Sequence, residues 1–526
     1  MKFLILAISA VLTATLYAYP DFGFLAYFSL IPYFYVIYSE VKKGTGHIKM
    51  YGIGYFWSML YFVPLFHWFA YQYPLEYLGV SKLWALAYVI VSMLGTSLVL
   101  SLSMALLPLL YSLYAKSRLH SRFPLLDAVV IPAAYVWIEW SYTRGEIAVP
   151  WARLALTRQN SLLELQSASI LGSYFVSFII VFINAALALA LIRFIRDKKI
   201  NLLRTTAVLC SLLFLSNCLL GLGLYKADVK GETGEAVRCA AIQGNLISGR
   251  SEDLTLYETI DLFFELSLPE IEKGAKLLVY PESCFSTYLT ENGPTHERIA
   301  EFAKEHDVTV VFGAFKNDSD CVMNVTYCIT PDGKLSLPYS KQHLVPFGEF
   351  VPFRSVTLKL MPLLADLDMM ESDITAGTEG LVWESPAGKL TSLICYDSAF
   401  EQTAIEGVRK GAEIITVSTN DSWFMDSAAI FEFNGQSKLR AIETRRYIVR
   451  SACSGVSDVI DPRGRVIDLQ PVLTRGSVSG DVTPRSDMTF YVRHPMLFLS
   501  LCAAFALLCP AGYEVFSRIK NKTLQG

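Results

Sequence analysis

Charged residues are scarce in this chain of 526 residues. Asp, Glu, Lys and Arg make up only 18% of it, whereas 53% is hydrophobic. This balance excludes a single soluble domain, because such domains carry about 25% charged residues. The apolar residues are also unevenly placed. They form long blocks as far as about Tyr225, short runs from Lys226 to Arg493, and a last block from Pro495 to Phe516.

The spacings that hold a metal ion are also lacking. The ten cysteines include no C-x-x-C pair and no Cys/His pair at zinc-ligand spacing, so we expect neither a metal site nor a cofactor. Cys321 and Cys328 leave a disulfide possible in an oxidising compartment. No basic stripe marks the segment 226–493, and we expect no nucleic-acid partner. Four cysteines lie in apolar blocks and are expected to pack there: Cys210, Cys218, Cys502 and Cys509.

The long apolar blocks predict membrane segments. Blocks of about 20 residues match a hydrocarbon layer roughly 30 Å thick. The first two blocks are joined only by YPDFG and are compatible with a hairpin as well as with two spans. The first also has the apolar stretch of a signal peptide, although its cleavage pattern is poor. We expect segments near residues 3–19, 22–39, 50–70, 83–114, 124–142, 167–192, 203–224 and 495–516.

Lys and Arg predict the orientation of these segments. Every second loop is basic, which marks the cytoplasmic side. Both termini should therefore be cytoplasmic and residues 226–493 should lie on the opposite face, the periplasm of a bacterium with two membranes. We expect a membrane bundle of about seven segments (1–225), an extracytoplasmic domain (226–493), and a C-terminal span with its tail (494–526). The basic loops and tail contain Lys42, Lys43, Lys49, Lys116, Arg118, Arg122, Arg193, Arg196, Lys198, Lys199, Arg204, Arg518, Lys520 and Lys522.

The extracytoplasmic segment has the pattern of a layered α/β domain. Short apolar runs alternate with segments of helical periodicity and with hairpin turns, which predicts a mixed sheet covered by helices. The loop region 344–380 is long for a compact domain, and we expect a functional rim or lid there. Within it, FRSVTLKLMPLLADLDMM (353–370) is apolar enough to face a membrane. Apolar strand runs are expected at 238–245, 275–283, 308–315 and 389–397.

Three polar residues stand where apolar strand runs end. Glu282 ends LLVYPE, Cys395 ends SLIC, and Lys341 follows a hairpin. Strand ends at one edge of an α/β sheet are where catalytic groups collect. A carboxylate can take the proton of a thiol and return it to a leaving group, and an ammonium can stabilise both the thiolate and an oxyanion. The three residues therefore predict nucleophilic catalysis by cysteine.

The motifs around these residues resemble those of a known family. YPES (280–283), YSKQHLVPFGEFVPF (339–353) and LICYD (393–397) occur in the order found in the carbon–nitrogen hydrolase (nitrilase) superfamily. The resemblance is closer still to its apolipoprotein N-acyltransferase family, which joins such a domain to a membrane bundle. It implies a multi-pass α-helical membrane bundle and an extracytoplasmic α/β domain of the nitrilase type, an αββα sandwich. Further similar stretches are AIQGN (241–245), STNDSWF (418–424), LRAIETRRYIVR (439–450), DPRGRVI (461–467) and YVWIEW (135–140).

The resemblance also implies roles for individual residues. Cys395 would be the nucleophile, Glu282 the general base and acid, and Lys341 the oxyanion stabiliser. Glu349 matches a second carboxylate beside this triad. Tyr396 matches a residue that shapes the pocket and offers its backbone N–H to the oxyanion.

Several positions depart from the family pattern. Asp397 stands where the family usually has Glu, which shortens a supporting contact by one methylene. Phe433 replaces a usual His, Cys453 replaces a usual Asn, and AVPW (148–151) replaces Gly-Phe-Pro-Trp. The stretch GNLISGRSE, which includes Glu252, lacks the usual Lys-Trp pair. These departures leave the three catalytic candidates intact.

Four further residues leave alternatives open. Glu349 could order its loop instead of serving the reaction, and His343 is more consistent with a structural hydrogen bond than with a base. Cys284 is expected to be a neutral thiol in the pocket wall. Glu139, at the end of a membrane segment, fits helix packing and substrate positioning equally well.

The resemblance implies an acyl transfer within a membrane. The acyl chain would pass from a phospholipid, through a thioester on the cysteine, to the α-amine of the N-terminal diacylglyceryl-cysteine of an apolipoprotein. The protein would be a multi-pass protein of the bacterial inner membrane with its catalytic domain on the periplasmic side. The alternative is a membrane-tethered amidase that hydrolyses a C–N bond with the same residues.

Overall fold

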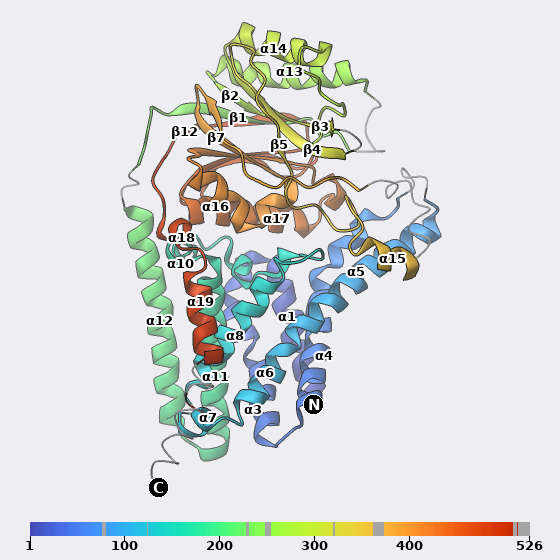
Figure 1. Cartoon of the computed structure of the whole chain (residues 1–526). Helices are drawn as coiled ribbons and strands as arrows, with labels where there is room; N and C mark the ends of the chain where they lie inside the picture. Colours follow the sequence, from blue (N-terminus) through green and yellow to red (C-terminus); the bar gives the residue numbers. More distant parts are fainter. Residues whose placement is uncertain are drawn as a thin grey trace, which may run out of the picture.

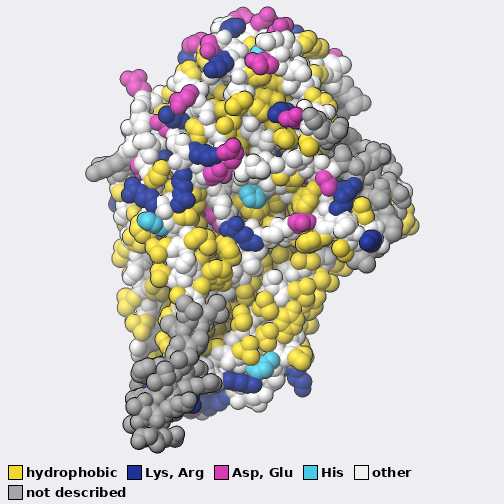
Figure 2. Space-filling model, in the orientation of Figure 1, with side chains coloured by type: hydrophobic (Ala, Val, Ile, Leu, Met, Phe, Trp, Pro, Cys, Tyr) yellow, Lys and Arg dark blue, Asp and Glu magenta, His cyan; other side chains and the backbone are white. Residues whose placement is uncertain are grey.

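The computed structural model describes residues 1–75, 80–123, 125–227, 231–247, 254–318, 321–360, 373–508 and 513. The N-terminal half forms a bundle of helices, and an α/β domain lies at one end of it (Figure 1). The surface of the bundle is largely apolar in the view of Figure 2, and Lys and Arg side chains gather at the end away from the α/β domain. This distribution fits a bundle surrounded by lipid.

Four helical segments of the described chain are long and apolar enough to cross a bilayer. They are Pro20–Lys42, Lys82–Tyr114, Ser173–Asp197 and Ile200–Lys226, and shorter apolar helices include Lys2–Ala18. The bundle helices are α1 (Lys2–Ala18), α2 (Ala26–Ser29), α3 (Ile31–Lys42), α4 (His47–Leu65), α5 (Lys82–Met104), α6 (Leu106–Tyr114), α7 (Arg118–Arg122), α8 (Asp127–Ser141), α9 (Leu162–Leu165), α10 (Ala168–Leu171), α11 (Ser173–Asp197) and α12 (Ile200–Lys226).

The segment predicted to begin at residue 167 begins later. Gly172 has φ +78°, which interrupts the helix and leaves α10 as a separate turn before α11 starts at Ser173. A Cβ atom at Gly172 would lie 2.4 Å from the ring of Tyr491, so glycine is also required for close packing there. The hydropathy of the segment does not reveal this break.

The α/β domain contains two six-stranded sheets packed face to face. One sheet has the order β12-β1-β2-β3-β4-β5, and the other β11-β10-β9-β8-β7-β6. Each sheet mixes parallel and antiparallel pairs, as predicted; β1 is parallel to β2 and antiparallel to β12. The strands are β1 (Val237–Gln243), β2 (Leu277–Val279), β3 (Thr309–Asp318), β4 (Cys321–Ile329), β5 (Tyr339–Ser340), β6 (Trp383–Ser385), β7 (Gly388–Ile394), β8 (Ile414–Thr419), β9 (Tyr447–Ala452), β10 (Ser457–Ile460), β11 (Val466–Gln470) and β12 (Gly476–Val482).

Helices cover the outer face of each sheet, which completes the expected αββα sandwich. Helices α13 (Leu256–Glu272) and α14 (Pro294–His306) cover one sheet, and α16 (Glu401–Arg409) and α17 (Ala428–Thr444) cover the other and face the bundle (Figure 1). Because α17 lies between a sheet and the bundle, nearly all of its side chains are buried, polar ones included. The last described elements are α18 (Phe490–Arg493), α19 (Leu497–Ala503) and η10 (Ala504–Leu508).

Buried ion pairs fasten the α/β domain to the bundle. Arg153 donates to Glu401 of α16 at 2.6 Å, and Tyr174 of α11 donates to the same carboxylate at 3.1 Å. Burial acts to raise the pKa of Glu401, but the guanidinium groups of Arg153 and Arg440 lower it to about 2. Arg440 also donates to Glu443 of the same helix, α17, at 2.8 Å, and Glu443 accepts the backbone N–H of Ser173 of α11 at 3.1 Å. Because breaking a buried pair is costly, these contacts hold the two parts in one orientation.

The structure answers one question that the sequence left open, and some sequence predictions fall outside the described residues. Cys321 and Cys328 lie on the same strand, β4, seven residues and roughly 23 Å apart, which excludes a disulfide between them. Of the expected lid, only α15 (Arg354–Leu360) and its flanks are described, and residues 361–370 lie outside the described chain. So do Glu252, Cys509 and the end of the last predicted membrane segment.

Candidate active site

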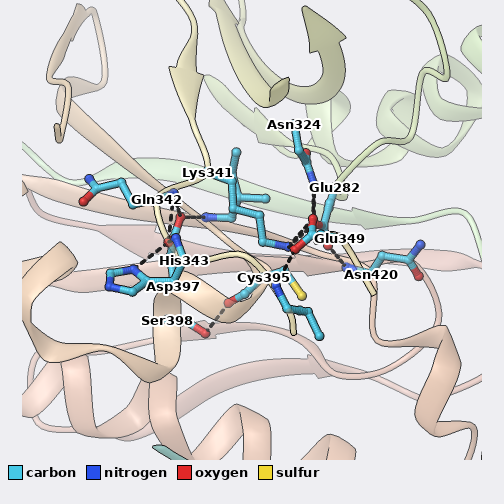
Figure 3. A network of polar contacts seen from close by, with 12 residues as sticks. Glu282, Asn324, Lys341, Gln342, His343, Glu349, Cys395, Asp397, Ser398 and Asn420 are labelled. Atoms are coloured by element: carbon cyan, nitrogen blue, oxygen red, sulfur yellow. Dashed lines mark hydrogen bonds and ion pairs between the residues drawn. The ribbon is translucent and has the colours of Figure 1, made fainter. Parts of the chain in front are cut away.

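The three catalytic candidates come together at one end of the sandwich. Cys395 follows β7 directly, Lys341 follows β5, and Glu282 lies three residues beyond β2. Since β7 belongs to one sheet and β2 and β5 to the other, the site lies where both sheets end. Figure 3 shows the Cys395 sulfur beside the carboxylates and the ammonium group. The sequence prediction that these residues share a site is thus consistent with their positions.

Lys341 lies between two carboxylates. Its Nζ atom is 2.8 Å from Oε1 of Glu282 and 2.9 Å from Oε1 of Glu349, and the residue is only 2% exposed. Burial alone would lower the pKa of this ammonium, but the two carboxylates together raise it well above its ordinary value. Lys341 therefore stays charged at any working pH.

Glu282 is held by two further donors. The side-chain amide of Asn324 donates to Oε1 at 2.7 Å, and the backbone N–H of Asn420 donates to Oε2 at 2.7 Å. Asn324 also donates to Glu349 at 3.2 Å and so bridges both carboxylates. Sequence reasoning missed Asn324. Its only signal was a single amide in the apolar strand CVMNVTYCI.

Glu349 contacts both Lys341 and the loop that follows it. It pairs with Lys341, and its Oε2 atom accepts the backbone N–H of Val345 at 2.8 Å, which closes the loop that follows Lys341. The carboxylate therefore orders its loop and adds negative charge beside the ammonium. It is placed next to the catalytic candidates, as expected.

The conformation of Cys395 is unusual. Its φ angle is +49°, in the left-handed region that a non-glycine residue seldom adopts, and it begins the tight turn η8 (Cys395–Ala399). Such strained positions cluster at functional sites. Burial raises the pKa of the thiol above its ordinary value, Glu282 raises it further, and Lys341 acts in the opposite direction. Cys395 is therefore a neutral thiol at rest, and it would need a base to act as a nucleophile.

This neutral thiol gives a testable pH dependence. Because the pKa of Cys395 is raised, the thiolate fraction is small at neutral pH and grows as pH increases. We expect the rate of alkylation of Cys395 by iodoacetamide to rise steadily from pH 6 to 9 without a plateau. Mass spectrometry of the alkylated peptide measures this rate, and Cys321, which is exposed, provides a control in the same sample. A plateau below pH 8 would contradict the raised pKa.

Asp397 connects turn η8, which we call the nucleophile turn after the role expected of Cys395, to the segment of Lys341. The carboxylate is fully buried and accepts the hydroxyl of Tyr339 at 2.8 Å and the backbone N–H of His343 at 2.8 Å. It also accepts the backbone N–H of Ile394 at 3.2 Å. The Asp397 side chain, one methylene shorter than the usual Glu, therefore still contacts the residues on either side of Lys341. The ring of His343 stacks on Phe400 with centroids 3.8 Å apart and lies 3.1 Å from Asp397, which agrees with a structural role.

Tyr396 connects the nucleophile turn to the bundle. Its hydroxyl donates to the backbone oxygen of Ala148 at 2.8 Å, in the loop that follows α8. Glu139, at the end of α8, accepts the backbone N–H of Leu154 at 2.6 Å and the hydroxyl of Ser177 at 3.1 Å. These contacts favour the packing role of Glu139.

Two other thiols lie in the domain core near the site. Cys284 contacts the backbone oxygen of Gly313 at 3.5 Å, and burial raises its pKa to about 12. Cys453 contacts the backbone oxygen of Glu282 at 3.7 Å, and burial raises its pKa as well. Both are neutral thiols, which agrees with the expectation for Cys284.

Comparison with known proteins places the chain in a family. Residues 238–485 match the family model of the carbon–nitrogen hydrolases, and residues 9–186 match that of the apolipoprotein N-acyltransferase N-terminal domain. An apolipoprotein N-acyltransferase of Gloeobacter violaceus is 27% identical over 490 residues, covering 92% of this chain and 89% of that protein.

A second relative and a solved structure are also similar. An apolipoprotein N-acyltransferase of Geobacter metallireducens is 29% identical over 392 residues, which cover 73% of this chain and 74% of that protein. Among solved structures, Nit3 of Saccharomyces cerevisiae, a member of the nitrilase superfamily, is 18% identical with a TM-score of 0.39 and covers 50% of this chain and 96% of that chain. The two family models match both the bundle and the α/β domain, and the chain belongs to the apolipoprotein N-acyltransferase family.

Proposed function

We propose that the protein transfers an acyl chain from a phospholipid to the α-amine of the N-terminal diacylglyceryl-cysteine of apolipoproteins. The observation that carries this proposal is Cys395 in a strained turn beside Lys341 and Glu282, in a domain fastened to an apolar bundle. Both substrates are lipid-anchored, so such an enzyme must work at a bilayer surface. Relatives that cover most of the chain carry the same activity in their names.

The first half-reaction forms a thioester. The Cys395 sulfur attacks the carbonyl carbon of the phospholipid acyl ester while Glu282 takes the thiol proton. Lys341, already charged and fixed between two carboxylates, stabilises the oxyanion of the tetrahedral intermediate. The ester C–O bond then breaks, and the lysophospholipid oxygen leaves with the proton from Glu282.

The second half-reaction transfers the chain to nitrogen. The neutral α-amine attacks the thioester carbonyl, and Glu282 accepts the proton that the new amide nitrogen loses. The C–S bond breaks and the Cys395 sulfur regains that proton. Glu282 thus serves as base and acid in both halves, and its two fixed oxygens, one on Lys341 and one on the Asn420 N–H, keep it in place.

The distribution of charge supports a location for the protein. We propose that the protein lies in the inner membrane with the α/β domain on the periplasmic side. Basic residues at the far end of the bundle support this orientation; Lys2 and Lys43 both pair there with Glu40, at 3.3 and 3.0 Å. Exposed apolar side chains on α5, such as Leu83 and Trp84, offer a lipid-facing surface at the end near the α/β domain.

The test separates a transferase from the alternative amidase. We would incubate the protein in phospholipid vesicles with a synthetic diacylglyceryl-cysteine peptide that has a free α-amine, and with the same peptide acetylated at that amine. The free peptide should gain the mass of one acyl chain, and the acetylated peptide should gain none. Release of free fatty acid without an acylated peptide would contradict the proposal and favour a hydrolase.

A further inference from the structure

Glu432 is a buried carboxylate without a cationic partner. It lies on α17, is 1% exposed, and its Oε2 atom accepts the indole N–H of Trp151 at 2.6 Å. No Lys or Arg of the described chain forms an ion pair with it, in contrast to Glu401 and Glu443 nearby on the same face of the domain. Burial of an unpaired carboxylate lowers the stability of the folded protein. The short hydrogen bond between Trp151 and Glu432 therefore requires an explanation.

Trp151 belongs to a short segment between α8 and α9 that we call the Trp151 loop (residues 148–153). Its ring stacks on Phe433 of α17 with centroids 5.4 Å apart. It also meets Phe424 at 5.6 Å and Trp68 at 5.1 Å. The indole therefore lies where the bundle, α17 and the segment after β8 meet.

The Trp151 loop contacts both elements that position the catalytic candidates. Ala148 accepts the hydroxyl of Tyr396, the residue directly after Cys395, at 2.8 Å. Phe424, which packs against Trp151, lies four residues beyond Asn420, whose N–H holds Glu282. A rotation of the indole would thus act on the nucleophile turn and on the segment that holds the base.

The surroundings of Glu432 contain few charges. The hydroxyl of Tyr17 in α1 donates to the backbone oxygen of Ala152, in the Trp151 loop, at 3.0 Å. Arg450 of β9 covers the ring of the next residue, Phe433, with its guanidinium 4.8 Å from the centroid. Burial raises the pKa of Glu432 to about 7, and the hydrogen bond from Trp151 acts in the opposite direction. The ionised carboxylate forms above that pH.

We infer that Glu432 is a positioning residue that holds the Trp151 loop against the nucleophile turn when its carboxylate is ionised. A hydrogen bond to an ionised acceptor is roughly twice as strong as a neutral one. Protonation of Glu432 weakens the contact, loosens the indole, and slows attack by Cys395. This inference rests on the proposed acyl transfer.

The test compares the pH profile of acylation in five forms of the full-length protein in vesicles. In the wild type we expect the rate of acyl-enzyme formation to rise about fivefold through pH 7, the scale of one charge-assisted hydrogen bond. Glu432→Gln and Trp151→Phe should each remove that inflection. The double variant Glu432→Gln/Trp151→Phe should have the same pH profile as each single variant. Trp140→Phe is the control, because no residue of the described chain hydrogen-bonds the buried indole nitrogen of Trp140, and it should keep the inflection. An inflection that persists in Glu432→Gln, or effects that multiply in the double variant, would overturn the inference.

A second readout does not depend on catalysis. With ¹⁵N-labelled tryptophan, the indole signal that disappears in Trp151→Phe should shift with an apparent pKa near 7 in the wild type and stay constant in Glu432→Gln. A signal that does not titrate would refute the inference. A titrating signal in a protein that forms no acyl adduct would instead refute the proposed function and leave the Glu432–Trp151 contact standing.

Discussion

Replacement of Cys395 by serine is expected to abolish the acyl adduct and to lower transfer by a factor on the order of 10⁴ or more. The effect should be this large because the proposed intermediate is a thioester, and the Cys395 thiol supplies its sulfur atom. A serine hydroxyl in the same turn is a far weaker nucleophile, because Glu282 would have to take the proton of a much weaker acid than a thiol. Intact-mass spectrometry after incubation with phospholipid measures the adduct.

The chemistry of the adduct identifies the bond. The wild-type adduct should be removed by hydroxylamine, as a thioester is, and the Cys395→Ser protein should show none. Cys321→Ser is the matched control, because Cys321 is exposed at the start of β4 and takes no part in the site. A hydroxylamine-sensitive adduct on Cys395→Ser would place the acyl chain on another residue and contradict the proposed role of Cys395.

The sequence allowed the catalytic candidates to be chosen because they stand where apolar runs end. Glu282, Lys341 and Cys395 follow strand runs, and strand ends at one side of a sheet converge in any layered α/β fold. The αββα arrangement itself came from the family resemblance. Helix and strand periodicity predicted the elements, but not the order of the strands in two separate sheets.

The residues that support the site were harder to predict. Asn324 acts from β4, across the sheet from Glu282, and only the strand order brings the two side chains to 2.7 Å. Glu432 meets Trp151 across the junction of bundle and domain, 281 residues apart in the chain. Contacts of this kind depend on packing between elements, which leaves no periodic signal. The Cys321–Cys328 disulfide that the sequence left possible is excluded for a different reason, because one continuous strand keeps the two cysteines apart.

Replacement of Lys341 by methionine should lower the rate of acyl-enzyme formation by about 10³-fold, the scale of losing one oxyanion stabiliser. A second cause adds to the first. Without the ammonium, Glu282 and Glu349 share the Asn324 amide with no cation between them. The two carboxylates then repel each other, so Glu282 is no longer held in place to act as a base. Quench-flow mass spectrometry measures the rate, and thermal unfolding in detergent measures the stability.

A double variant separates the two causes. Lys341→Met leaves buried carboxylates without their partner, which costs about 3–5 kcal/mol of stability. Adding Glu349→Gln removes one of the two charges, so Lys341→Met/Glu349→Gln should regain much of the unfolding temperature. Its acylation rate should remain low, because no ammonium meets the oxyanion. Lys389→Met, which removes an exposed lysine paired with Glu384 at 3.0 Å, should change neither quantity measurably. Recovery of the rate together with the stability would show that Lys341 serves only to hold the carboxylates, and would remove it from the proposed chemistry.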